Sequence, residues 1–346
     1  MAMATAMASA EHRGRGRSAT ERAEGSTPPS LPQVPPDGTS SRRPVMLRPM
    51  EHRVRTYTTA DGVRLHTEIW APDGPARFVV PISHGSGEHV GRHAWLGEAV
   101  AARGGLAFGP DHRGEGLSGG PRGHVDAFET YAADLAFVAA KVREDEDAWT
   151  EGLPLLPFGH SMGGLILLVA LVDGAFERLL SRPPSGAVVS APLLGLAMKV
   201  PRIKVALARL AARFVPTFAQ PAEIPASAIS RDPEVVRAYE ADTRRSRVVS
   251  VGWFVAMEKA IARVQREVAG LALPMLWLVG TGDRIVDPEA IRRTFARLPD
   301  PTAHDQRLEV FDGYYHELHN EPAGLREPVR QLVADWLADH AKPTSA

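Results

Sequence analysis

Residues 159–164 read Gly-His-Ser-Met-Gly-Gly and contain the pattern G-x-S-x-G. A short apolar run, 155–158, precedes this stretch, and a longer one, 165–172, follows it. The pattern alone is weak, because glycine and serine are common in loops. Between an apolar strand and an apolar helix, however, it is typical of a sharp turn that exposes a nucleophilic serine. The glycines let strand and helix approach each other. We therefore expect Ser161 to face a cleft that a base and a substrate can both reach.

The segment 152–172 has no charged residue and is long enough to span a membrane. Two prolines and the glycine-rich turn interrupt it, so a buried strand, turn and helix explain it better. With 346 residues, 44% of them hydrophobic, the chain can form one large domain with an insertion, or two domains.

Charge and cysteine content exclude several classes of protein. The net charge of −1, from 40 basic and 41 acidic residues, gives no overall field that would attract nucleic acid. The absence of cysteine excludes disulfides, thiolate catalysis and cysteine-ligated metals.

Residues 1–45 differ in composition from the rest of the chain. They are rich in alanine, serine, glycine, proline and arginine, and such a segment buries too little apolar surface to offset the entropy of ordering it. The first ten residues lack the leucine-rich core and the leading basic residue of a signal peptide. We therefore expect a disordered tail and a cytoplasmic protein.

From residue 46 onward, strand-like and helix-like patterns alternate. The runs 54–59 and 63–70 alternate in polarity around Asp61-Gly62, which suits a tight hairpin turn. Buried strands are expected at 78–82, 106–109, 155–158, 187–190, 275–279 and 308–311, and helices at 93–103, 128–144, 165–172, 288–297 and 325–341. This order predicts an α/β fold with a mostly parallel sheet and helices on both faces.

The segment 192–251 interrupts this rhythm, with helical patches and no convincing strand. We interpret it as a helical cap inserted over the carboxyl edge of the sheet, between the core parts 46–191 and 252–346. Four apolar residues share one helical stripe and three arginines another: Ile203, Leu207, Leu210 and Phe214, and Arg202, Arg209 and Arg213. We favour a cap helix with its apolar side on the core. The alternative is a basic amphipathic helix that touches anionic lipid or guides an acyl chain.

A serine nucleophile needs a histidine as general base, held in the right tautomer by a carboxylate. Between residues 172 and 325 the histidines are His304, His316 and His319. His304 lies in a polar run typical of a surface loop. His316 is the first histidine after the strand 308–311, so we favour it over His319. The last two could suggest a metal, but no third ligand of suitable spacing is nearby and none is expected.

The acid that orients this histidine should follow the strand 275–279. Asp283 lies there in a glycine-rich turn, and we predict it as the acid. Asp287 precedes Pro288, a setting typical of a helix N-cap.

The intermediate of acyl transfer also needs backbone N–H donors that already point at its oxyanion. One is expected from Met162, the residue after the nucleophile. The other should come from the loop 83–89, Ser-His-Gly-Ser-Gly-Glu-His, where flanking glycines make Ser86 the candidate. We interpret His84 and His89 as residues that shape this loop rather than as a second base.

Six motifs together resemble those of a known family, and the resemblance extends from about residue 46 to the C-terminus. They are 84–89, 111–118 (Asp-His-Arg-Gly-Glu-Gly-Leu-Ser), 122–125, 159–164, 282–287 and 315–319. Together and in this order they resemble bacterial monoacylglycerol lipases and lysophospholipases of the α/β-hydrolase superfamily, in its serine-aminopeptidase-like branch. The resemblance implies the α/β-hydrolase fold with a mobile cap and no cofactor. It gives the same roles to the five site residues: Ser161, Asp283, His316, Ser86 and Met162.

The implied activity is hydrolysis of carboxylic esters of lipid-like substrates, monoacylglycerols or lysophospholipids, through an acyl-enzyme on Ser161. A thioesterase, an acyltransferase or a peptidase would use the same triad, because the cap and not the fold selects the substrate. A ligand-binding protein without catalysis is a third alternative, although such proteins tend to lose triad members. The expected partners are a lipid or ester molecule and, through the cap, a membrane surface, but no nucleic acid.

Two places depart from the family pattern. Glu115 stands where the Asp-x-Arg-Gly-x-Gly loop usually has histidine, and we expect only a change in loop packing. The segment 242–247, Asp-Thr-Arg-Arg-Ser-Arg, is more basic than usual in the cap, which leaves the acyl-chain preference open.

Overall fold

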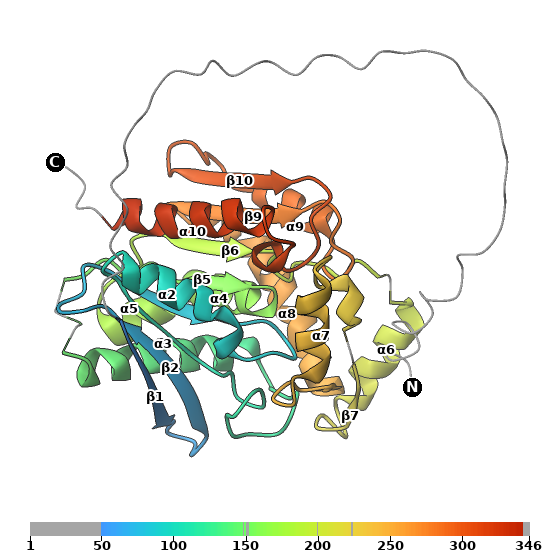
Figure 1. Cartoon of the computed structure of the whole chain (residues 1–346). Helices are drawn as coiled ribbons and strands as arrows, with labels where there is room; N and C mark the ends of the chain where they lie inside the picture. The colour runs from blue at the N-terminus through green and yellow to red at the C-terminus, as the bar shows by residue number, and fades with distance from the viewer. Residues whose placement is uncertain (1–49, 148, 150–151, 199, 223, 342–346) are drawn as a thin grey trace, which may run out of the picture.

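The computed structural model describes residues 50–147, 149, 152–198, 200–222 and 224–341 (Figure 1). The tail expected at 1–45 lies outside these residues. Eight strands form the main sheet in the order β1-β2-β4-β3-β5-β6-β9-β10. Their bounds are β1 (Glu51–Thr58), β2 (Arg64–Ala71), β3 (Val79–Ser83), β4 (Leu106–Pro110), β5 (Phe158–His160), β6 (Ala187–Ser190), β9 (Met275–Gly280) and β10 (Gln306–Phe311).

The sheet is mostly parallel, as the sequence predicts. β2 pairs antiparallel with both β1 and β4, and the remaining neighbours pair in parallel. The β1–β2 hairpin turns at Gly62, whose φ of 83° favours glycine. The carboxyl ends of the parallel strands therefore lie along one edge of the sheet, where α/β folds bind their ligands.

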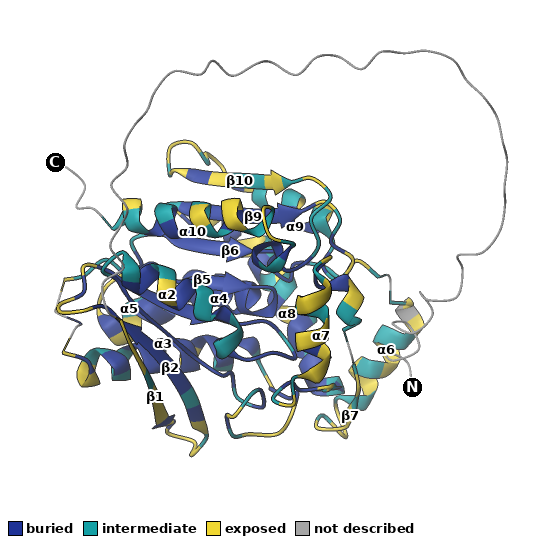
Figure 2. Cartoon of the chain, in the orientation of Figure 1, coloured by how far each residue is buried: buried dark blue, intermediate teal, exposed yellow. Residues whose placement is uncertain are grey.

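Helices cover both faces of the sheet, and each face has its own apolar core. One core includes side chains of α3 (Phe128–Asp145), α4 (Met162–Val172), α5 (Ala175–Leu180), α8 (Val251–Glu267) and α9 (Pro288–Phe295). The other includes α2 (Ala94–Ala102) and α10 (Arg326–His340). Single turns of 3₁₀-helix lie at η1 (Val90–His93), η3 (Val268–Gly270) and η4 (Leu318–Asn320). Figure 2 shows the inner strands β5, β6 and β9 as buried, whereas the edge strands β1 and β10 are mostly exposed or intermediate.

One local expectation is wrong, and one helix was missed. The strand expected at 155–158 is β5, which begins only at Phe158, while Leu155 makes an isolated bridge to Val79. Pro157 has no N–H to donate to a ladder, which explains the late start. The amphipathic helix α8 was not expected at all, although Ser250 provides an N-cap signal by accepting a hydrogen bond from the Trp253 N–H.

The segment 192–251, called the cap segment below, contains α6 (Arg202–Ala211), β7 (Ala219–Pro221), η2 (Ala226–Ala228), α7 (Pro233–Ala241) and β8 (Val248–Ser250). β7 and β8 pair antiparallel, so the expectation of no strand here is wrong. Each is three residues long, too short to give an alternating pattern. Figure 1 shows α6 and α7 beyond the arrowheads of the parallel strands.

The packing expected for α6 is also wrong. Its apolar stripe faces solvent: the exposed fractions are 68% for Ile203, 58% for Leu207 and 54% for Leu210. Phe214, in the turn after α6, is 77% exposed. The helix rests on the core through Val205 and Ala208 instead, which turns the larger apolar side chains outward (Figure 2). None of the described helices is both long and apolar enough to span a membrane.

Candidate active site

Ser161 lies on a strained turn between β5 and α4. Its φ of 55° and ψ of −119° fall in a region that residues with a Cβ rarely adopt. Its N–H donates to the Ser190 carbonyl at 3.0 Å, and its own carbonyl accepts from the Leu193 N–H at 2.9 Å. These bonds to the end of β6 and to the chain that follows it hold the serine in its unusual geometry.

Gly159 and Gly163 are required because other backbone atoms approach them too closely for a Cβ to fit. A Cβ on Gly163 would lie 2.0 Å from the Ser83 carbonyl oxygen, and one on Gly159 would lie 2.5 Å from the Gly163 oxygen. Both distances are far below van der Waals contact. The first turn of α4 therefore packs directly against the end of β3, which brings Met162 next to the loop that follows β3.

The predicted acid and base are in contact. His316 Nδ1 lies 2.7 Å from Asp283 Oδ2. The other oxygen of Asp283 accepts from the N–H groups of Ile285 at 2.8 Å and Val286 at 3.0 Å. Both side chains are buried. The carboxylate is thus oriented by the backbone, and it fixes in turn the tautomer of the histidine.

His316 lies beside the turn that carries the serine. Its ring centroid is 4.8 Å from that of His160, the residue before Ser161. Among the described hydrogen bonds, none joins the Ser161 hydroxyl to His316. Without substrate such a bond is often long, and it tightens in the reacting complex.

The proton affinity of His316 differs from that of the histidines around it. Burial opposes its charged form, but the Asp283 carboxylate outweighs burial and raises the pKa of His316 above its ordinary value. His160 and His319 are equally buried and lack such a carboxylate, and burial lowers the pKa of each well below the usual range. His316 is therefore the histidine best suited to accept a proton.

The remaining candidates have other surroundings. His319 packs against the rings of His93 and Trp95, at centroid distances of 5.2 and 5.3 Å. His304 lies half-buried in the loop before β10. The prediction of Asp287 as an N-cap is confirmed, since its side chain accepts from the Glu289 N–H at the start of α9.

The loop 83–89, called the oxyanion loop below for its predicted role, passes beside Ser161. A Cβ on Gly85 would lie 3.2 Å from the Ser161 Cβ, and the next residue, Ser86, is half-buried. The two histidines of the loop bond away from Ser161: His84 Nε2 accepts from the backbone of the loop after β4 at 2.9 Å, and His89 Nε2 lies 2.8 Å from the Asp242 carboxylate. Both therefore connect the oxyanion loop to neighbouring segments.

Sequence reasoning missed a buried ionic cluster below this loop. Burial opposes ionisation of Glu88, but His93 and Arg92 outweigh it and hold the pKa of the Glu88 carboxyl well below its usual range. Arg92 also donates to both oxygens of Glu317, each at 2.7 Å. Arg92 and His93 follow Glu88 by only four and five residues, so this part of the cluster was open to prediction, whereas Glu317 joins it from a distant segment.

Glu115, the departure in the loop after β4, is also buried. Burial raises the pKa of its carboxyl to about 8, so the side chain is mostly protonated at neutral pH. Among the residues that the structure describes, no three histidine, aspartate or glutamate side chains are grouped as a metal site requires.

Comparison with known proteins now places this geometry in a family. Residues 74–323, which include the turn, the acid and the base, match the model of the serine aminopeptidase S33 family. The chain belongs to this family. It is an α/β hydrolase, and the α/β-hydrolase fold predicted from its motifs is confirmed.

Several relatives match this chain over nearly their whole length. A monoacylglycerol lipase of Mycolicibacterium smegmatis is 31% identical over 82% of this chain and 96% of its own. Phospholipase YtpA of Bacillus subtilis is 29% identical over 73% of this chain and 92% of its own. The crystal structure of Paleococcus ferrophilus monoacylglycerol lipase has a TM-score of 0.68 and 29% identity, covering 80% of this chain and 99% of that one.

Proposed function

We propose that this protein hydrolyses monoacylglycerols and releases a fatty acid through an acyl-enzyme on Ser161. The broader statement, a serine hydrolase that cleaves carboxylic esters of lipid-like substrates, follows from the family and its named relatives. The observation that carries the assignment of residues is the Asp283–His316 hydrogen bond of 2.7 Å beside a strained serine. This is the arrangement that acyl transfer by a serine requires.

The site residues divide the steps of the proposed reaction among them. His316 takes the proton of Ser161 as the hydroxyl oxygen attacks the ester carbonyl, and Asp283 stabilises the imidazolium that forms. The N–H groups of Ser86 and Met162 bind the oxyanion of the tetrahedral intermediate. His316 then gives its proton to the departing glycerol oxygen. Water, activated by His316, finally cleaves the acyl-enzyme and frees Ser161.

Lysophospholipids form a second candidate substrate class. The favouring observation is the similarity to a protein named phospholipase, together with exposed arginines such as Arg209 and Arg213 on the cap segment. Guanidinium groups bind phosphate well, so a phosphate head group would be compatible with this surface.

A panel of substrates tests the proposal. Purified protein is assayed with a monoacylglycerol, a lysophospholipid of the same acyl chain, the corresponding thioester and an aminoacyl amide. We expect the highest kcat/KM for the monoacylglycerol and a loss of at least about 10⁴-fold in Ser161→Ala. A faster lysophospholipid reaction would transfer the assignment to the second class. Unchanged hydrolysis by a folded Ser161→Ala variant would contradict the mechanism.

We also propose that the exposed face of α6 contacts an anionic lipid surface. Ile203, Leu207 and Leu210 present an exposed apolar stripe on α6, and Phe214 is exposed in the turn that follows. Arg209, which pairs with Glu258, and Arg213 are exposed near the stripe. Such a combination binds membrane interfaces through apolar insertion and attraction to anionic head groups. Contact there would bring the cap segment to the surface from which a lipid substrate enters.

Vesicle binding tests this contact. We expect the double variant Leu207→Ser, Phe214→Ser to bind vesicles containing phosphatidylglycerol at least about tenfold more weakly, because two large apolar side chains no longer insert. The matched control is Leu179→Ser, which replaces an exposed leucine on α5, away from the cap segment. Equal binding by all three proteins would refute the contact.

A further inference from the structure

Two hydrogen bonds hold the oxyanion loop on either side of the Ser86 N–H. On one side, the Gly85 N–H donates to the buried carboxylate of Glu88. On the other, the Gly87 carbonyl accepts from Arg245 Nε at 3.2 Å. Glu88 belongs to the loop itself, whereas Arg245 lies in the cap segment, between α7 and β8. Ser86 is therefore flanked by one contact from the core side and one from the cap segment, and His89 adds a further contact to the cap segment through Asp242.

The guanidinium of Arg245 is held in one orientation. Its Cζ lies 3.3 Å from the centroid of the Tyr239 ring, and Nη1 donates to the Tyr239 carbonyl at 2.8 Å. The side chain is only 9% exposed, and its described hydrogen bonds go to backbone carbonyls rather than to a carboxylate. Removing a guanidinium from water is costly, so these contacts must all be kept to offset it.

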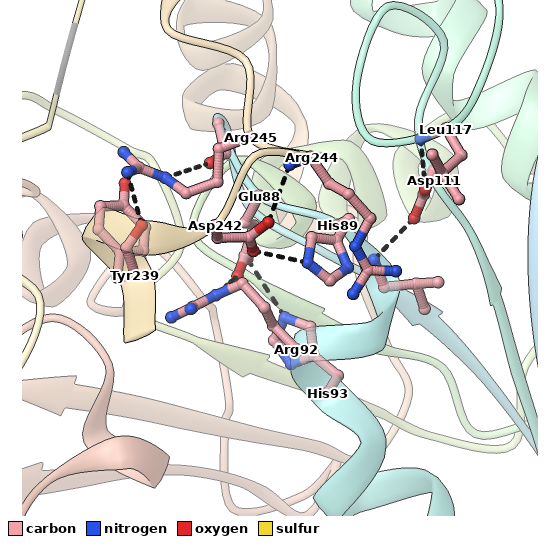
Figure 3. A network of polar contacts seen from close by, with 12 residues as sticks. Glu88, His89, Arg92, His93, Asp111, Leu117, Tyr239, Asp242, Arg244 and Arg245 are labelled. Carbon is pink, nitrogen blue, oxygen red and sulfur yellow. Dashed lines mark hydrogen bonds and ion pairs between the residues drawn. The ribbon is translucent and has the colours of Figure 1, made fainter. Parts of the chain in front are cut away.

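The same cluster also reaches the loop that carries the base. Arg92 lies 4.9 Å from the centroid of the Tyr239 ring and bonds to Glu88 at 3.1 Å. It also binds Glu317, the residue that follows His316. Figure 3 shows Tyr239 and Arg245 on the cap segment beside Glu88 and Arg92 from the core.

We propose that Arg245 is a positioning residue for the oxyanion hole. It holds the Gly87 carbonyl, and with Glu88 it sets the direction of the intervening Ser86 N–H toward the oxyanion. This inference rests on the proposed roles of Ser161 and Ser86. Its physical basis is that oxyanion donors stabilise the transition state only when they are oriented before the reaction. A residue of the cap segment would thus contribute to the chemical step as well as to substrate access.

The test uses a short, water-soluble acetate ester, which does not need the cap segment for binding, and active sites are titrated with a fluorophosphonate. We expect Arg245→Met to lower kcat per active site by about 10-fold to 100-fold with little change in KM, because a misplaced donor weakens transition-state binding. A trifluoromethyl ketone, which forms a tetrahedral adduct, should bind more weakly by a similar factor. Arg245→Lys should recover part of the loss, since it keeps a cationic donor but not the planar fork.

The matched control is Arg247→Met. Arg247 is exposed, and its side chain donates a hydrogen bond to the Glu240 carbonyl within the cap segment. We expect wild-type kcat and inhibitor affinity from it. Unchanged kcat in Arg245→Met with only a lower melting temperature would overturn the proposal. A rise in KM confined to long-chain esters would overturn it as well, because it would assign Arg245 to substrate binding.

The result can be separated from a failure of the proposed function. If Ser161→Ala keeps the activity of the wild type, the proposed mechanism fails, whatever Arg245 does. If activity depends on Ser161 and Arg245→Met equals the wild type in kcat and inhibitor affinity, only the positioning role fails.

Discussion

The helices α4 and α6 both carry many apolar side chains, but they place them in opposite surroundings. Residues 165–170 of α4 are fully buried between the sheet and the helices of one face. On α6, the largest apolar side chains are more than half exposed. The apolar surface of α4 stabilises the fold and holds the turn of Ser161, whereas that of α6 adds little to folding. An exposed apolar stripe of this kind marks an interaction surface.

The largest effect is expected from the substitution Asp283→Asn. It changes the buried region around the turn of Ser161 and leaves the exposed face of α6 untouched. We expect kcat to fall by about 10⁴-fold for long-chain and short-chain esters alike, since the amide favours the wrong tautomer of His316. Asp287→Asn is the control, because asparagine also caps a helix and activity should be retained. Near-normal activity of Asp283→Asn would remove it from the triad.

A second test compares leucines of the two helices. Leu168→Ala on α4 should lower the free energy of unfolding by about 2–5 kcal/mol, because it leaves a cavity in the core. Leu207→Ala on α6 should change it by less than about 0.5 kcal/mol, since the side chain is exposed. Urea denaturation measures both values. Similar losses would mean that α6 packs in solution, as the sequence pattern favoured.

The pH profile provides the smallest and most local test. His316 must be neutral to accept a proton, and Asp283 raises its pKa. As the pH falls through that pKa, kcat/KM for a soluble ester should decrease by about tenfold per unit. The acid limb should therefore lie above the ordinary pKa of histidine.

Two variants check the origin of this limb. In Asp283→Asn the acid limb of the residual activity should move to lower pH. The carboxylate that raises the pKa of His316 is then gone, while burial still lowers this pKa. In Leu207→Ser it should stay in place, because the Leu207 side chain is exposed to solvent whereas His316 is buried. A shift in the second variant would mean that the cap helix influences the proton affinity of the base.

Local patterns predicted the parts of the site that depend on short segments. The turn of Ser161 follows from glycines that no other residue can replace at such close contacts, and the position of Asp283 follows from the strand before it. From the sequence, His316 was preferred over His319 only because it is the first histidine after the strand 308–311. The structure adds the contact to Asp283 that distinguishes the two. The strands β7 and β8 escaped prediction because three residues are too few for a pattern.

By itself, the sequence determined the α/β architecture, the family and the order of Ser161, Asp283 and His316, because these depend on periodicity and on motifs a few residues long. Only the tertiary structure decided where the apolar stripe of α6 faces and that Arg245 reaches the carbonyl of Gly87. Both depend on how distant segments meet. An amphipathic pattern shows that a helix has two sides, but the neighbouring elements determine which side they cover.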